Sequence, residues 1–263
     1  MRVALCLSGP VGFLYHNKRA YAWNQDVDYR IGHEHYKKHL FDVNDNVDVF
    51  IFSWSGGYKD EINKLYKPKK SKYAEQIDFK PLMKHESTKD KWCPRFNHKI
   101  SRWYGFQQVI NLKSEYEAEN NFKYDWVISS RFDEAFLSDL VLEHYPNDGS
   151  IYFPFNGNFM PNRPRCLEYF YFSNSEVMDK YSTLYDNWED YGFFDHHDES
   201  YHHADKLGLP IVMIESFKES VNHDLVRAIY DDCHYMGDEY PGIDKLTKLN
   251  QYPRGDAPKG GRF

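Results

Sequence analysis

The sequence is poor in cysteine and contains no long apolar run. Its four cysteines, Cys6, Cys93, Cys166 and Cys233, include no CxxC pair. This spacing argues against a zinc ribbon and against the disulfide framework of a secreted domain. No stretch approaches the ~18 consecutive apolar residues that a membrane span needs, and the apolar run at the N-terminus is too short for a signal peptide. We therefore expect a cytoplasmic protein without a membrane span.

Acidic residues outnumber basic residues, and the formal net charge is −7. No basic stripe dominates, so we expect neither an extended surface for duplexes nor a nucleic-acid partner. One dense cationic run occurs at residues 67–72, and we predict that it forms a solvated loop. Aromatic residues, in contrast, reach 18%. Their rings suit the stacking of sugars and bases, although a tyrosine-rich core and rim would explain the same composition.

Apolar runs of strand length alternate with segments of helical periodicity. Strands are predicted at residues 2–7, 46–54, 124–130, 151–155, 168–172 and 209–214, and helices at residues 28–41, 99–119 and 196–206, with a further helix opened by a capping box at residues 173–176. This alternation indicates an α/β fold with a mixed, mostly parallel sheet flanked by helices. Residues 57–95 are predicted to form an irregular segment that contains one short helix.

In sheets of this kind, ligands bind beyond the carboxyl ends of the strands. The loops that follow residues 8, 54 and 130 should therefore converge on one site. Residues 8–12, SGPVG, form the first of these loops, and their free N–H groups could hold phosphate or a base edge. The segment is neither GxGxxG nor a P-loop, so a plain turn is an equally good interpretation.

The most distinctive segment is VISSRFDEAF at residues 127–136. Arg131 there precedes Asp133 by two residues, directly after a predicted strand. A carboxylate in that position is well placed to hold a divalent cation, and a neighbouring arginine can bind a diphosphate through two hydrogen bonds. The alternative is an Arg–Asp ion pair at a strand end, with Asp133 as the N-cap of a helix. The residues alone favour neither interpretation.

Residues 195–203, DHHDESYHH, place histidines and carboxylates at helical spacing. No HExxH motif is present and no cysteine lies nearby, so the spacing is weak support for zinc. We predict a solvated helix face for most of these side chains. A single carboxylate of the segment is expected to reach the edge of the sheet.

Residues 123–133, KYDWVISSRFD, resemble the YDxVxxxRxD segment of small viral and bacterial glycosyltransferases of the GT-A fold. In that fold the segment ends in the DxD motif, which binds a metal ion and the nucleotide diphosphate. Looser similarity extends over residues 3–9, 48–54, 101–108, 168–178, 198–201 and 207–211, within residues 2–215. Arg131 stands in place of the first Asp of the motif, which would leave Asp133 as the main metal ligand.

The resemblance implies a GT-A-like, Rossmann-type fold and a glycosyltransferase, in particular a hexosyltransferase. Such an enzyme would transfer a sugar from a nucleotide diphosphate sugar, a UDP-sugar in the first instance, to a glycan or other acceptor, with Mn²⁺ or Mg²⁺ as cofactor. Residues 1–236 would form the catalytic domain, with the nucleotide-binding half in residues 1–135 and the acceptor half in residues 136–236, and residues 237–263 would form a tail. A viral member would act in the host cytoplasm.

The resemblance also implies roles for single residues. The residues expected to bind the nucleotide and the donor are Leu7, Ser8, Gly9, Trp54, Tyr104, Arg131 and Asp133, with Trp54 or Tyr104 stacking on uracil. The expected metal ligands are Asp133 and His223. The expected catalytic residue is Asp198 or Glu199, which would act as the base of an inverting enzyme or as the carboxylate that stabilises the sugar cation in a retaining one. The loop at residues 155–167 is expected to recognise the acceptor.

Two other functions are compatible with the same residues. A metal-dependent phosphohydrolase or nucleotidyltransferase would use acids at the strand ends, but that class groups more carboxylates than Asp133 and Glu134. A carbohydrate-binding protein that kept the fold and lost catalysis would account for the many aromatic residues, and for Arg131 in place of an acid.

Overall fold

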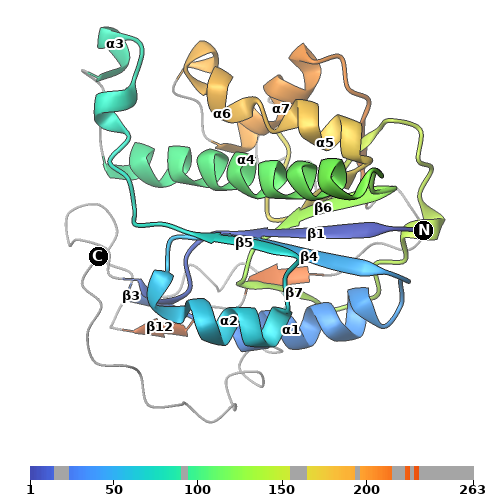
Figure 1. Ribbon diagram of the computed structural model, residues 1–263. Helices are drawn as coiled ribbons and strands as arrows, with labels where there is room; N and C mark the ends of the chain where they lie inside the picture. The colour runs from blue at the N-terminus through green and yellow to red at the C-terminus, as the bar shows by residue number, and fades with distance from the viewer. Residues whose placement is uncertain are drawn as a thin grey trace, which may run out of the picture.

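The computed structural model describes residues 1–14, 24–89, 94–154, 165–192, 196–214, 223–225 and 228–230. A seven-stranded sheet lies at its centre (Figure 1). In spatial order its strands are β10 (Ile211–Met213), β8 (Ile151–Phe153), β9 (Tyr171–Ser173), β6 (Trp126–Ser130), β1 (Val3–Ser8), β4 (Val47–Ser53) and β5 (Lys70–Tyr73). Only β9 is antiparallel to its neighbours in this sheet. The predicted mixed, mostly parallel sheet is thus confirmed.

The central strands are buried on both faces, as expected of parallel strands that are covered by helices. Every residue of β1 is buried. Val3, Leu5 and Leu7 pack into the hydrophobic cluster on one face, whereas Ala4 and Cys6 pack into the cluster on the other. This division follows from the two-residue period of a strand, which directs successive side chains to opposite faces.

Helices cover each face of the sheet (Figure 1). On one side lie α1 (Tyr29–Tyr36), continued by a π-helical segment (Lys37–Phe41), and α2 (Lys59–Tyr66); on the other lie α4 (Pro94–Asn120), α5 (Ser175–Tyr181), α6 (Leu184–Asn187) and α7 (His196–Lys206). Short 3-10 turns occur at Gly56–Tyr58, Lys80–Leu82, Leu142–His144 and Trp188–Tyr191. The helices predicted at residues 28–41, 99–119 and 196–206 are confirmed.

Residues 57–95 are more regular than predicted. They contain α2, the edge strand β5 and α3 (Glu86–Lys89). Within β5, Lys70 donates to Glu119 at 2.5 Å and to Glu115 at 3.2 Å. The prediction of a solvated loop at residues 67–72 is therefore wrong in part, because the backbone of β5 completes the hydrogen bonding of β4.

The N-terminus of α5 also differs from the prediction. The hydroxyl of Ser173, at the end of β9, donates to Ser150 O at 2.6 Å. Asn174 is the N-cap instead, since its side chain accepts from Val177 N at 3.0 Å. The predicted helix is present, but its cap lies one residue later because Ser173 belongs to the sheet.

Several short strands were not predicted. β7 (Glu134–Phe136) pairs with β11 (His223–Leu225), and β3 (Asn24–Val27) lies between β2 (Gly12–Leu14) and β12 (Ala228–Tyr230). The tail predicted at residues 237–263 lies outside the described residues. Among the helices that the structure describes, none is both long and apolar enough to cross a membrane.

Candidate functional site

The carboxyl ends of β1, β4 and β6 lie side by side at one edge of the sheet, as predicted, because β1 is parallel to both neighbours. In the first loop, Gly9 N donates to Phe52 O at 3.2 Å, and Val11 N donates to Ser55 Oγ at 2.9 Å. Gly9 has a φ of +132°, and a Cβ there would meet no described atom within 4 Å. The backbone at Gly9 thus borders open space that a ligand could occupy.

The reversed strand β9 brings a further carboxylate to this edge. Tyr171, the first residue of β9, lies opposite Ser129 near the carboxyl end of β6. Glu168 precedes β9 by three residues and therefore belongs to the same edge. It was not among the predicted site residues, since nothing in the sequence of residues 168–172 indicates the direction of the strand.

Arg102 of α4 connects the first loop with Glu168. Its Nη1 donates to Ser8 Oγ at 2.8 Å, and its Nη2 donates to Glu168 O at 2.9 Å. Its Nε is buried and has no hydrogen-bond partner within the described ranges. The guanidinium is therefore held in place between the end of β1 and the segment that precedes β9. The sequence offered only a faint signal for Arg102, its place in the segment SRWYGFQQ.

Arg131 and Asp133 form a bidentate ion pair after β6. Nε donates to Oδ1 at 2.8 Å and Nη2 donates to Oδ2 at 2.9 Å, and Asp133 is only 4% exposed. Burial by itself would lower the pKa of Arg131, but the charges of Asp133 and Glu168 outweigh burial and raise that pKa. Asp133 leads into β7 rather than into a helix. The predicted ion pair is confirmed, and the predicted helix N-cap is wrong.

The residues expected to hold Mn²⁺ or Mg²⁺ have other partners. Both carboxylate oxygens of Asp133 accept hydrogen bonds from Arg131. The Nδ1 of His223 lies 2.5 Å from Oε1 of Glu134, a fully buried carboxyl whose pKa is raised by burial and lowered in part by His223. An ion at Asp133 would compete with the guanidinium for the same oxygens. This arrangement does not fit the expected ion at Asp133 and His223.

Glu168 instead lies against two histidines of the first turn of α7. One of its oxygens lies 3.4 Å from His196 Nε2, and the other is in direct contact with His197 Nδ1. Burial would raise the pKa of Glu168, but His196, His197 and Arg102 hold that pKa well below its usual value. Burial lowers the pKa of His196 to about 4, even though Glu168 opposes the shift. At neutral pH, Glu168 is therefore ionised and His196 is neutral.

The proposed catalytic acids are buried side chains with cationic partners. Asp198 Oδ1 accepts from Arg165 Nε at 2.9 Å. Glu199 accepts from Lys99 Nζ at 2.5 Å and from Trp103 Nε1 at 3.0 Å. Burial raises the pKa of Glu199 to about 7, although Lys99 opposes the shift. The prediction of a mostly solvated helix face is wrong, because Asp198, Glu199, Ser200 and His203 are all buried.

The aromatic residues expected to stack on uracil stack on each other. The rings of Trp54 and Tyr104 lie 5.5 Å apart at an interplanar angle of 26°, and Trp54 is almost fully buried. One face of each ring is therefore already covered. Leu7 is fully buried between β4 and β6, which does not support its expected contact with a nucleotide. Of the loop at residues 155–167, only residues 165–167 lie in the described part of the chain.

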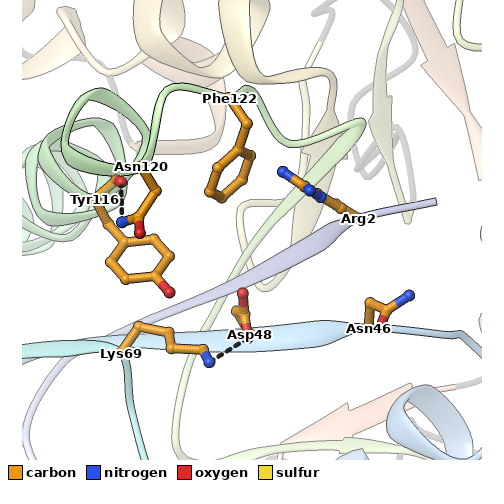
Figure 2. A pocket seen from close by; sticks show the side chains of 7 residues that line it. All are labelled: Arg2, Asn46, Asp48, Lys69, Tyr116, Asn120 and Phe122. Atoms are coloured by element: carbon orange, nitrogen blue, oxygen red, sulfur yellow. Dashed lines mark hydrogen bonds and ion pairs between the residues drawn. The ribbon is translucent and has the colours of Figure 1, made fainter.

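A polar pocket of about 560 Å³ lies at the opposite, amino-terminal edge of β1 and β4 (Figure 2). Its lining residues are Arg2, Asn46, Asp48, Lys69, Tyr116, Asn120 and Phe122. The Arg2 guanidinium lies 4.3 Å from the centre of the Phe122 ring, and Lys69 pairs with Asp48 at 3.3 Å (Figure 2). These groups are satisfied by one another, and the pocket is separate from the carboxyl edge.

The carboxyl edge therefore combines Arg102, the bidentate pair of Arg131 and Asp133, and the cluster of Glu168, His196 and His197. The open backbone at Gly9 lies at the same edge. This combination suits an anionic ligand, because guanidinium groups bind phosphate oxygens through paired hydrogen bonds. No protein-family model matches the chain, and no curated protein matches it either.

Proposed function

We propose that this chain is a glycosyltransferase of the GT-A type, which transfers a sugar from a nucleotide diphosphate sugar, a UDP-sugar in the first instance, to a glycan acceptor. The observation that carries the proposal is that two arginines lie at the carboxyl edge: Arg102 donates to Ser8 at the end of β1, and Arg131 directly follows β6. The mostly parallel sheet is compatible with a Rossmann-type nucleotide-binding fold.

The two arginines have complementary roles in the proposal. Arg102, which is fixed by Ser8 and Glu168, adds positive charge next to the open backbone at Gly9. Arg131 is oriented by Asp133, which fixes the plane of the guanidinium. Together they stabilise the charge that develops on the diphosphate as it leaves the sugar, an electrostatic contribution that a prearranged site supplies without further reorganisation.

A carboxylate near the anomeric carbon would stabilise the oxocarbenium-like transition state. Of the two predicted acids, Asp198 is the better candidate. Glu199 is enclosed between Lys99 and Trp103, where it holds α7 against α4. Asp198 is positioned by Arg165, which belongs to the segment at residues 155–167 proposed to recognise the acceptor.

Calorimetric titration of the full chain with UDP, with and without Mn²⁺, tests the proposal. We expect UDP to bind and Arg102→Lys to weaken binding about tenfold or more, because lysine lacks the planar set of donors. Arg30→Lys is the matched control, since Arg30 also pairs with an aspartate, Asp28, but its side chain is largely exposed. Absence of UDP binding under both conditions would refute the proposal.

A second candidate is a carbohydrate-binding protein that retains the fold without turnover. The observation in its favour is that Asp198 and Glu199 are both fully buried and paired with cations, so that neither is accessible as a base. Incubation with a UDP-sugar separates the two candidates, because a transferase passes the sugar to an acceptor, or slowly to water, and releases UDP. Binding of sugars without any release of UDP would support the second candidate.

A further inference from the structure

Three metal-ligating side chains from two segments meet at the carboxyl edge. We infer that Glu168, His196 and His197 form a site for a divalent transition-metal ion, with Zn²⁺ as the first choice. One ligand atom from each residue can be chosen such that all three lie within 4.8 Å of one another. The Arg131–Asp133 motif lies at the end of a different strand. It assigns no metal-binding role to these three residues.

The distances suit an ion after a small adjustment. Zinc bonds to histidine nitrogen and carboxylate oxygen are about 2.0–2.2 Å long, so neighbouring ligand atoms of a tetrahedral site are about 3.3–3.6 Å apart. The separation of 3.4 Å between Glu168 and His196 Nε2 already matches this geometry. The contact between Glu168 and His197 Nδ1 is shorter, so these two atoms would have to move apart to admit an ion between them.

The two segments that supply the ligands are tied together. Cys166 N donates to His197 O at 3.1 Å, and Arg165 Nε donates to Asp198 Oδ1 at 2.9 Å. Arg102 holds the main-chain oxygen of Glu168 from the opposite side. Hydrogen bonds of this kind orient the ligands before the ion arrives, which increases the affinity of a metal site.

The ligand types decide which ions can bind. Imidazole nitrogen suits zinc and other first-row transition metals, whereas Mg²⁺ and Ca²⁺ prefer oxygen ligands alone. Two histidines and one glutamate also leave a coordination position for water or for an oxygen of a ligand. Such an ion would add positive charge to the edge where Arg102 and Arg131 lie. The inference about the metal does not depend on the identity of any sugar donor.

Titration with Zn²⁺ alone, followed by calorimetry, tests the inference on the full chain. We expect one strong site per chain, no comparable site for Mg²⁺, and a loss of affinity for Zn²⁺ of at least about a hundredfold in His197→Ala, because removal of a ligand costs more than removal of a residue that only orients one. His202→Ala is the matched control, since His202 lies on the same helix outside the cluster. Its affinity for Zn²⁺ should be unchanged.

Absorption spectroscopy with Co²⁺ provides a second measurement that is independent of calorimetry. The visible absorption of Co²⁺ bound to imidazole ligands should appear with the unaltered chain and disappear in His197→Ala and in His196→Ala. Glu168→Gln should show the same loss, and if that variant fails to fold, the partly exposed His196 carries the test. Zn²⁺ affinity that is absent, or equal in His197→Ala and His202→Ala, would overturn the inference.

Discussion

Arg131 and Asp133 form an ion pair at the point where the chain leaves the buried strand β6. Both side chains are largely shielded from water, with exposed fractions of 20% and 5%. Loss of one partner would leave the other as a poorly solvated charge, which is far more costly than the pair itself is favourable. The pair therefore contributes to stability as well as to the proposed binding of diphosphate.

We expect Arg131→Met to lower the free energy of unfolding by about 3 kcal/mol, because Asp133 loses its counter-charge. The double variant Arg131→Met/Asp133→Asn should recover much of that loss. Urea unfolding at pH 7 measures both. Arg30→Met is the control and should change stability by less than about 1 kcal/mol, since its pair with Asp28 is exposed. Additive effects in the double variant would contradict the assignment.

Glu199 should make stability depend on pH. Its pKa is raised to about 7 in the folded chain, against an ordinary value of 4.5, so the folded state holds a proton that the unfolded state has lost. Stability contributed by this group is present below about pH 4.5 and is lost as the pH rises to about 7. His196 and His203, whose pKa values are lowered to about 4, act in the opposite direction over an overlapping range.

The contribution of Glu199 can be isolated with Glu199→Gln. Relative to the unaltered chain, this variant should gain about 3 kcal/mol of stability between pH 4.5 and pH 7.5, as the shift in pKa implies. Urea unfolding at both pH values gives the change, and any constant cost of losing the Lys99 pair cancels in the difference. An identical pH dependence in both proteins would show that Glu199 titrates normally.

The sequence predicted the Arg131–Asp133 pair because its members are two residues apart. It did not predict the partners of Asp198 and Glu199, which lie 33 and 100 residues away along the chain. Glu168 was missed for the same reason. The sequence shows which side chains could act as acids, bases or cations. Their burial and their ion-pair partners depend on contacts between distant residues, which only the folded chain creates.

Helix α1 fixes the position of the turn that carries the pair. Gly32 of α1 lies so close to this turn that a Cβ would come within 2.3 Å of Phe132 O. Since Phe132 sits between Arg131 and Asp133, the approach of α1 sets the path of the backbone at the candidate site.

We expect Gly32→Ala to destabilise the chain by about 2 kcal/mol or more, because the backbone of the turn or the helix must shift to admit the methyl group. The same variant should weaken UDP binding, since the shift displaces the Arg131 backbone. Thermal melting and calorimetry measure the two effects. Gly57→Ala is the matched control, because no described atom lies within 4 Å of the added Cβ. Unaltered stability in Gly32→Ala would show that the close contact is not rigid.

Long elements were predicted more successfully than short ones. α4 and α7 show helical periodicity over several turns, and β1 and β4 are continuous apolar runs, so both kinds are recognisable without tertiary information. β7 and β11 contain three residues each and were not predicted. Strands of that length carry too little pattern to be found unless they lie in a longer apolar run, as β10 does. The reversal of β9 leaves no trace in its composition.

The whole chain carries a net negative charge, while the carboxyl edge carries two arginines. An anionic donor is therefore attracted locally and repelled by the rest of the surface. Salt shortens the reach of both effects, from a Debye length of about 10 Å at 0.1 M to about 3 Å at 1 M. Salt should therefore weaken the longer-range attraction to the arginines and the repulsion from the rest of the surface more strongly than it weakens direct contacts.

We expect the affinity for UDP to fall severalfold, by about threefold or more, between 0.05 M and 0.5 M NaCl, as screening of an exposed anion implies. Uridine lacks the diphosphate and serves as the control ligand, so its affinity should change little. Calorimetric titration at the two salt concentrations measures both ligands. Equal salt dependence for UDP and uridine would mean that the diphosphate does not contact Arg102 or Arg131.

The reversal of β9 has a consequence for how this molecule can diversify. β8 ends, and β9 begins, at the same edge of the sheet, so the connection between them starts and finishes beside the candidate site. An insertion, deletion or exchange in that connection changes the rim of the site without a new crossover and without altering the order of the strands. In the proposed transferase, acceptor preference can therefore diverge, or be engineered by grafting, on a scaffold that stays the same.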